Sequence, residues 1–257
     1  MEFSTIASGS SGNCIYIKGG NTRILVDVGC SMKLIKTSLS QFDTSIEEIE
    51  AILVTHEHSD HVSRVAQLSR RYAIPVYASA LTWENLPFYN DYFPSDRHIF
   101  DYGMEIGDVA LDFFRLSHDA VQPVGMIFEQ GGQHIGLVTD TGIVTEAMYR
   151  QLTNMDGLII ESNHDLSLLR YGPYPAYLKK RVASELGHLS NTQTAEALCR
   201  LVGPLTRQVI LAHLSETNNR PELALDEVCR VLEVSCPEKT AVSVAPRKAA
   251  HPLIILG

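Results

Sequence analysis

The chain has 257 residues, of which 45% are hydrophobic and 20% charged, the composition of an ordinary globular protein. Its net charge of −9 argues against a chain-wide electrostatic grip on nucleic acid, although a local basic patch and metal ions could still hold one. The N-terminus lacks a basic start followed by an apolar segment, and no run approaches the ~18 apolar residues of a membrane span. We therefore expect a cytoplasmic protein without a membrane segment.

The five cysteines are scattered and form no C-x-x-C pair. That usage indicates reduced structural thiols in a reducing compartment, rather than disulfides or zinc fingers. The chain shows no internal repeat, low-complexity tract or Pro/Gly-rich linker, so we predict a single domain over residues 1–257.

Strands and helices are predicted in two comparable halves, which favours the α/β class. The first half has predicted strands at 3–8, 14–18, 22–29, 51–56 and 74–79, with helices at 31–42 and 62–72. The second half has predicted strands at 109–117, 125–129, 134–140, 157–162, 208–215 and 240–245, with helices from 145 and at 177–186, 189–202 and 221–233. We expect helices to cover both faces of the β layers.

The segment "ILVTHEHSDH" carries the strongest chemical signal. His56, His58, Asp60 and His61 lie within six residues, directly after a buried strand, where a loop can converge them on one point. Imidazole and carboxylate ligands together suit zinc, manganese or iron. The spacing could give one ion to His56 and His58 and a second ion to Asp60 and His61.

Further ligands are expected at the ends of other predicted strands. His118, Asp140 and His213 each follow an apolar run, so each would project from the same rim of the sheets. A carboxylate such as Asp140 can bridge two cations. Asp27 ends an earlier strand and would orient a ligand histidine or the loop. A lone histidine in such a place is usually a surface or core-edge residue, and the tight cluster is what favours metal.

This pattern resembles the metallo-β-lactamase-fold hydrolases over nearly the whole chain. The resemblance implies a four-layer αββα sandwich with a di-metal site at its edge. It implies one ion on His56, His58 and His118, the other on Asp60, His61 and His213, and Asp140 as the bridge. Lactamase-like sites lack that bridge, so β-lactam hydrolysis is not expected.

Other segments resemble the WalJ/YycJ-like branch of this fold, whose members are proposed DNA exonucleases. "SGSSGNC", "SHDA", "TDTG", "ESNHD", "YPAYLKKR", "GHLSN" and "LAHLS" follow that family's order. The chain has no room for the additional domain of the related β-CASP nucleases. The resemblance implies a 5′ exonuclease that acts on DNA. It also implies two divalent metal ions, which can be zinc, manganese or iron.

Phosphodiester hydrolysis fits such a site, because two ions about 3.5–4 Å apart can activate water and stabilise charge on the phosphoryl oxygens. Asp60 is the predicted orienter or base, and His188 is predicted to assist the leaving oxygen. His188, Ser190 and Asn191 stand at a predicted helix start, where phosphate binds well, although Ser190 can simply cap the helix. The remaining predicted substrate contacts are Asn163, His164, Lys179 and Arg181.

The basic segment "YLKKR", with Tyr171 and Tyr174 before it, suits the binding of a single nucleic-acid strand, but it can equally be a solvated helix face.

Two alternatives stay open beside the nuclease: a thioester or lactone hydrolase with the same metals, and a binding protein with a structural site. The sequence leaves open the metal, DNA against RNA, strandedness, polarity and the oligomeric state. His251 is predicted at the surface, and "PLIIL" can dock on the body or on a partner.

Overall fold

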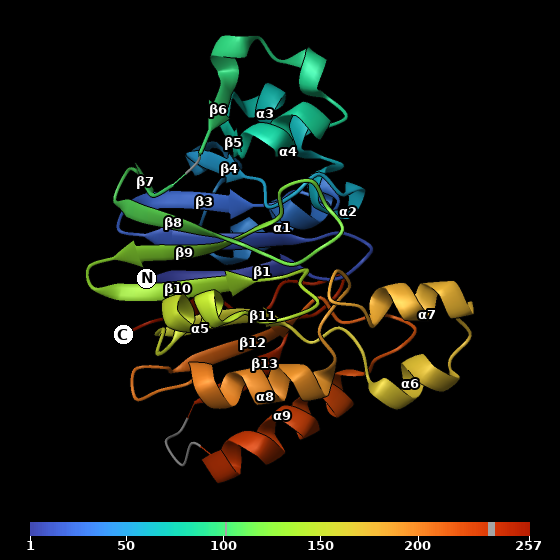
Figure 1. Cartoon of the computed structure of the whole chain (residues 1–257). Coiled ribbons are helices and arrows are strands. Elements are labelled where there is room, and N and C mark those ends of the chain that lie inside the picture. The colour runs from blue at the N-terminus through green and yellow to red at the C-terminus, as the bar shows by residue number, and fades with distance from the viewer. Residues whose placement is uncertain (101, 236–239) are drawn as a thin grey trace.

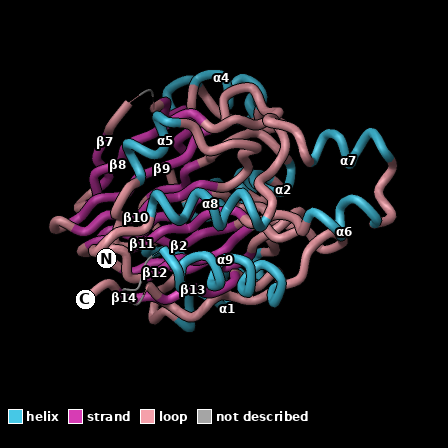
Figure 2. Tube along the Cα trace, turned by 60° about the horizontal axis from the view of Figure 1, so that its bottom comes forward, coloured by secondary structure: helices cyan, strands magenta, loops and turns pink. Residues whose placement is uncertain are grey.

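The computed structural model describes residues 1–100, 102–235 and 240–257, which form two seven-stranded sheets packed face to face (Figure 1). Helices cover the outer face of each sheet, so the layers run helix, sheet, sheet, helix (Figure 2). This is the predicted αββα sandwich. The two termini lie at one end of the sheets, and helices α6 and α7 project from the other end.

The first sheet has the strand order β14-β1-β2-β3-β4-β5-β6. Its pairs are antiparallel from β14 to β3 and parallel from β3 to β6. The strands are β1 (Glu2–Ala7), β2 (Cys14–Gly19), β3 (Thr22–Val26), β4 (Ala51–Leu53), β5 (Val76–Ala78), β6 (Arg97–Ile99) and β14 (Ile254–Ile255).

The second sheet repeats this plan with the order β13-β12-β11-β10-β9-β8-β7. Its pairs are antiparallel from β7 to β10 and parallel from β10 to β13. The strands are β7 (Met104–Ile106), β8 (Val109–Arg115), β9 (Val124–Gln130), β10 (Gln133–Val138), β11 (Gly157–Glu161), β12 (Gln208–Ala212) and β13 (Ala241–Val244). Because parallel strands end at the same edge, the residues after β10, β11 and β12 come together there.

Three apolar clusters hold the four layers together. One lies under the helices of the first sheet, one lies between the sheets around Phe3, Phe128 and Ile210, and one lies under the helices of the second sheet. The helices are α1 (Met32–Gln41), α2 (Ser59–Val62), α3 (Val65–Tyr72), α4 (Ala80–Asn85), α5 (Glu146–Leu152), α6 (Leu166–Tyr171), α7 (Ala176–Val182), α8 (Asn191–Leu201) and α9 (Pro221–Ser235), with short 3-10 turns at Ile46–Glu48, Tyr89–Asp91 and Pro94–Asp96.

The C-terminal segment corrects one prediction. His251 is buried rather than at the surface, because its backbone N–H donates to the Thr5 carbonyl and its ring lies 2.9 Å from the Ser243 hydroxyl. Strand β14 pairs with β1, so the apolar tail docks on the body of the protein itself.

The described cysteines Cys14, Cys30, Cys199 and Cys229 form no disulfide, and Cys236 lies outside the described residues. None of the helices in the described ranges has both the length and the apolar character that crossing a membrane requires.

Candidate metal centre

Three residues of the site follow strands and share a left-handed backbone conformation. Asp27 follows β3, Asp140 follows β10 and His213 follows β12, and all three have left-handed backbone conformations, with φ of 57°, 60° and 54°. This conformation costs a non-glycine residue about 1–2 kcal/mol and persists only where the surroundings enforce it. The sharp turn lets each side chain leave its strand end and point into the site.

The histidine motif is partly helical, which differs from the predicted loop. His56 lies in the loop between β4 and α2, His58 is the N-cap of α2, and Asp60 and His61 lie on that single helical turn. The turn packs on the segments before β2 and after β3. The Asn13 N–H donates to the Asp60 carbonyl, and a Cβ on Gly29 would lie 1.6 Å from that carbonyl oxygen.

The predicted ligand residues converge at this edge. Two triads, His56 with His58 and His118, and Asp60 with His61 and His213, each have potential ligand atoms within 4.8 Å of one another. Asp140 lies between them: its Oδ2 is 3.2 Å from His61 Nε2, and its Oδ1 is 3.3 Å from His213 Nδ1 and 3.9 Å from His118 Nε2.

The donor atoms of this cluster fit divalent cations. Four buried atoms, His56 Nε2, Asp140 Oδ2 and both ring nitrogens of His213, have no hydrogen-bond partner among the described residues. A buried polar atom without a partner is costly, and atoms of this kind aimed at one space are satisfied when a cation binds there. Nitrogen and oxygen ligands together suit zinc, manganese and iron.

The charges around the cluster also favour bound cations. Burial raises the pKa of Asp140, but His213 and His61 outweigh that effect and hold it well below its ordinary value. Burial lowers the pKa of His213, yet Asp140, Asp60 and Glu161 raise it to about 10. Burial and neighbouring His61 hold the pKa of His56 well below its usual range, so its ring is neutral and can donate a lone pair.

Neighbouring groups fix which nitrogen each histidine presents. His61 Nδ1 lies 2.7 Å from Asp27 Oδ2, and Asp27 is itself held by the backbone N–H and the hydroxyl of Thr55, at 2.9 and 2.8 Å. His118 Nδ1 donates to the Gly187 carbonyl over 3.1 Å. In both rings the contact occupies Nδ1 and leaves Nε2 facing the cluster.

Glu161 and Asn13 have no role predicted from the sequence, yet both lie at the cluster. Glu161 ends β11, is fully buried and has its Oε2 3.0 Å from His188 Nδ1 and 3.4 Å from His213 Nδ1. Asn13 Nδ2 lies 2.9 Å from His61 Nε2 and 3.2 Å from Asp60 Oδ2. The signal for Glu161 was available, since it is a carboxylate at the end of an apolar run, as Asp140 is.

Four predicted substrate contacts are buried behind the cluster. Ser190 accepts a hydrogen bond from the Gln193 N–H as the N-cap of α8, and Asn191 accepts from the Ser162 hydroxyl. Asn163 donates to the His213 carbonyl, and the His164 carbonyl accepts from the Asn191 N–H. These bonds give the four residues a supporting role, and their contact with a substrate stays a prediction.

Lys179 and Arg181 lie on α7, beside the site. Lys179 Nζ donates to the Arg170 carbonyl over 2.8 Å, and Arg181 forms an ion pair with Asp119, the neighbour of His118.

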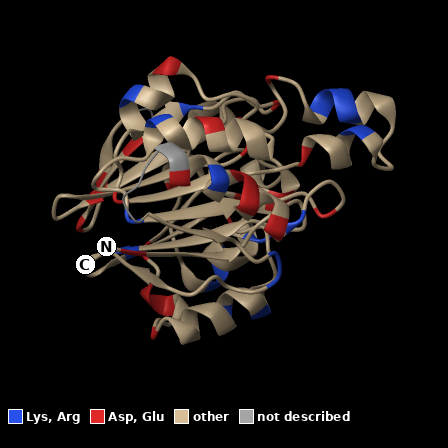
Figure 3. Ribbon diagram, turned by 90° about the horizontal axis from the view of Figure 1, so that it is seen from below, with Lys and Arg blue, Asp and Glu red and all other residues tan. Residues whose placement is uncertain are grey.

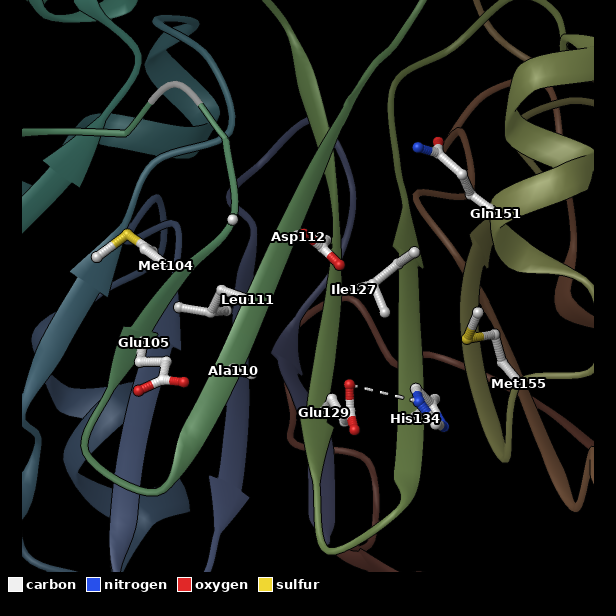
Figure 4. Close-up of a pocket in the computed structure, with 11 residues that line it drawn as sticks. Met104, Glu105, Ala110, Leu111, Asp112, Ile127, Glu129, His134, Gln151 and Met155 are labelled. Atoms are coloured by element: carbon white, nitrogen blue, oxygen red, sulfur yellow. Dashed lines mark ion pairs between the residues drawn. The ribbon is translucent and has the colours of Figure 1, made fainter.

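A hollow of about 770 Å³ elsewhere on the surface has different chemistry (Figure 4). It lies on the outer face of β7 to β10 beside α5, and its lining includes Glu105, Asp112 and Glu129, with His134 3.6 Å from Glu129. An acidic lining repels a polyanion, so this hollow is not a candidate nucleic-acid site.

Comparison with known families agrees with the geometry. Residues 22–214 match the model of the Beta-lactamase superfamily domain. The chain belongs to the beta-lactamase superfamily. Within this superfamily it is 42% identical over 229 residues to exodeoxyribonuclease WalJ of Streptococcus pneumoniae, covering 87% of this chain and 85% of that one. It is 38% identical over 236 residues to exodeoxyribonuclease YycJ of Bacillus anthracis, covering 91% and 89%. The chain therefore also belongs to the WalJ/YycJ family.

A solved structure is similar in fold over nearly the whole of this chain. The metallo-β-lactamase-fold protein YhfI of Bacillus subtilis superposes with a TM-score of 0.71, covering 97% of this chain and 98% of that one, at 16% identity. At this identity the likeness concerns the fold alone.

Proposed function

We propose that this chain is a di-metal-dependent exodeoxyribonuclease that hydrolyses DNA from its 5′ end and works in the cytoplasm. One observation carries the proposal: all seven predicted ligand side chains fall in overlapping groups of potential ligand atoms, and several of their buried atoms have no hydrogen-bond partner among the described residues. The identity of 42% to an exodeoxyribonuclease, over 87% of the chain, supports DNA as the substrate.

The ligand atoms divide into two sets. His56, His58 and His118 would hold one ion and Asp60, His61 and His213 the other, with Asp140 between them. Zinc or manganese are the ions proposed, and iron suits the same ligands. Bound there, such ions lower the pKa of water and stabilise charge on phosphoryl oxygens.

Asp60 and His188 are the residues proposed to move protons. The Asp60 side chain is 23% exposed, the most accessible carboxylate of the ligand set, and would accept a proton from the attacking water. The water oxygen bonds to phosphorus while the bond from phosphorus to the leaving oxygen breaks. His188 is 18% exposed and has its Nδ1 3.0 Å from Glu161 Oε2. It would give that oxygen a proton, with the carboxylate holding its ring in place.

A substrate panel tests this class of reaction. The purified chain, with manganese or zinc, is offered DNA, RNA, a thioester and a lactone, and the rate on each is measured. The proposal predicts turnover of DNA above the other substrates. Turnover of the thioester or the lactone without cleavage of nucleic acid would replace the proposal by a small-molecule hydrolase.

A further inference from the structure

Helices α6 and α7 form an arm, residues 166–186, which stands clear of the sandwich in two views (Figures 1 and 2). All residues of α7 are described, and none of their side chains is buried. An isolated helix of this length is unstable in water, and most helices are stabilised by packing an apolar face. The core of this protein therefore does not explain why α7 is kept.

The exposed surface of the arm combines aromatic and cationic groups. Tyr171 and Tyr177 are 77% and 75% exposed, and the Arg170 guanidinium lies 5.4 Å from the Tyr171 ring centre. The arm has four cations, Arg170, Lys179, Lys180 and Arg181, and one acid, Glu185, on a chain whose net charge is −9 (Figure 3). Such a local positive charge fits a polyanion, and exposed rings offer stacking surfaces for unpaired bases.

The base of the arm is fixed to the metal centre. Arg181 pairs with Asp119, the Asp119 N–H donates to the Leu186 carbonyl over 3.1 Å, and the Gly187 carbonyl accepts from His118. On the other side, a Cβ on Gly142 would lie 2.3 Å from the Ser184 carbonyl oxygen, so the segment after Asp140 packs against the end of the arm. A strand that lies along the arm is thereby directed toward the ligand cluster.

We propose that the arm binds the nucleic-acid strand outside the metal centre, with Tyr171 and Tyr177 stacking on unpaired bases and Arg170 and Lys180 contacting phosphates. This inference rests on the proposed nuclease function for the identity of the ligand. It assigns the strand-binding role to Arg170 and Lys180 in place of Lys179 and Arg181, whose cationic groups contact the Arg170 carbonyl and Asp119.

Two substrates separate the arm from the metal centre. A long single-stranded oligodeoxynucleotide reaches both, and the p-nitrophenyl ester of thymidine 5′-phosphate reaches the metal centre alone. We compare the kcat/KM for the long strand with the kcat/KM for the ester. In the double variant Tyr171→Ala/Tyr177→Ala, we expect this ratio to fall about tenfold or more, because KM for the long strand rises. Tyr102→Ala, at an 84% exposed tyrosine away from the arm, is the matched control and should leave the ratio unchanged.

The affinity of the arm for DNA can be measured even if the wild-type chain cleaves no DNA. Fluorescence anisotropy of labelled single-stranded DNA should show weaker binding in Tyr171→Ala/Tyr177→Ala and a smaller salt dependence in Lys180→Glu. Unchanged affinity in both variants overturns the inference, whatever the fate of the nuclease proposal. If the variants instead only lower the mass measured by sedimentation equilibrium, the arm is a contact between copies of this chain, and the inference is wrong.

Discussion

The Glu161 carboxylate and the His188 imidazole lie 3.0 Å apart, between Oε2 and Nδ1, and Glu161 is fully buried. Burial raises the pKa of Glu161, but the nearby rings of His188 and His213 hold it below its usual value, so the carboxylate is ionised. A carboxylate at this distance holds the imidazole ring in one orientation, with Nδ1 toward Glu161. The pair thus has the arrangement of a general acid with its supporting base.

Replacing His188 by Ala should lower kcat for DNA by about 10²-fold or more, because general acid catalysis typically contributes that much. Glu161→Gln should lower kcat less, since it removes the charge but keeps the shape. The bound metal, measured by plasma mass spectrometry, should stay the same in His188→Ala. Wild-type kcat in His188→Ala would remove this residue from the mechanism.

Asp27→Asn tests the orientation of His61. The amide keeps the volume of the carboxylate but has one uncharged oxygen in place of two charged ones. It therefore cannot accept hydrogen bonds from Thr55 and His61 as the carboxylate does, and the His61 ring loses its fixed tautomer. Metal affinity should fall about 10- to 100-fold, as it does when such supporting groups are lost. Competition with a coloured chelator measures the change. Asp112→Asn, at an exposed carboxylate on the outer face of β8, is the control and should keep full affinity.

Gly29→Ala tests the contact between two loops of the site. The new Cβ would lie 1.6 Å from the Asp60 carbonyl oxygen, so the turn that carries Asp60 and His61 has to move. We expect a loss of about 1–3 kcal/mol in the free energy of unfolding, together with weaker metal binding. Gly131→Ala is the comparison: its Cβ meets nothing within 4 Å, so only its φ of 60° costs energy and metal binding should be intact. Equal metal binding in the two variants would contradict this account.

Metal removal should destabilise the folded chain. The buried atoms of His56, Asp140 and His213 that lack a hydrogen bond would bind a cation only in the native state, so the ion would stabilise that state by mass action. At 100 times the dissociation constant this amounts to about 2.7 kcal/mol, a shift of roughly 5–10 °C in Tm for a chain of this size. Thermal unfolding with a chelator and with added zinc or manganese measures it. Identical Tm values under both conditions would argue that the cluster holds no ion.

The convergence of the candidate ligands could largely be predicted from the sequence, because these residues follow buried strands and such strands are easy to recognise. Asp140 and His213 each end an apolar run, and the sheets bring those ends to one edge. The left-handed backbone of these residues had no sequence signal, since it is imposed by the surrounding packing.

Other features depended on contacts between distant segments. His251 was predicted at the surface, but the pairing of β14 with β1 buries it against Ser243. The exposed arm was predicted only as a helix over 177–186, whereas the structure has two short helices and ends α7 at Val182. Glu161 was missed as a site residue although it ends an apolar run, because the sequence does not place His188, 27 residues along the chain, beside it.

Digestion of end-labelled DNA tests the central claim most directly. Single- and double-stranded DNA, labelled at the 5′ or the 3′ end, is incubated with the chain and manganese or zinc, beside the Asp140→Ala variant. The account predicts stepwise release from the 5′ end by the wild-type chain and none by a folded Asp140→Ala variant. Equal cleavage by both proteins, or no cleavage with either metal, would contradict it.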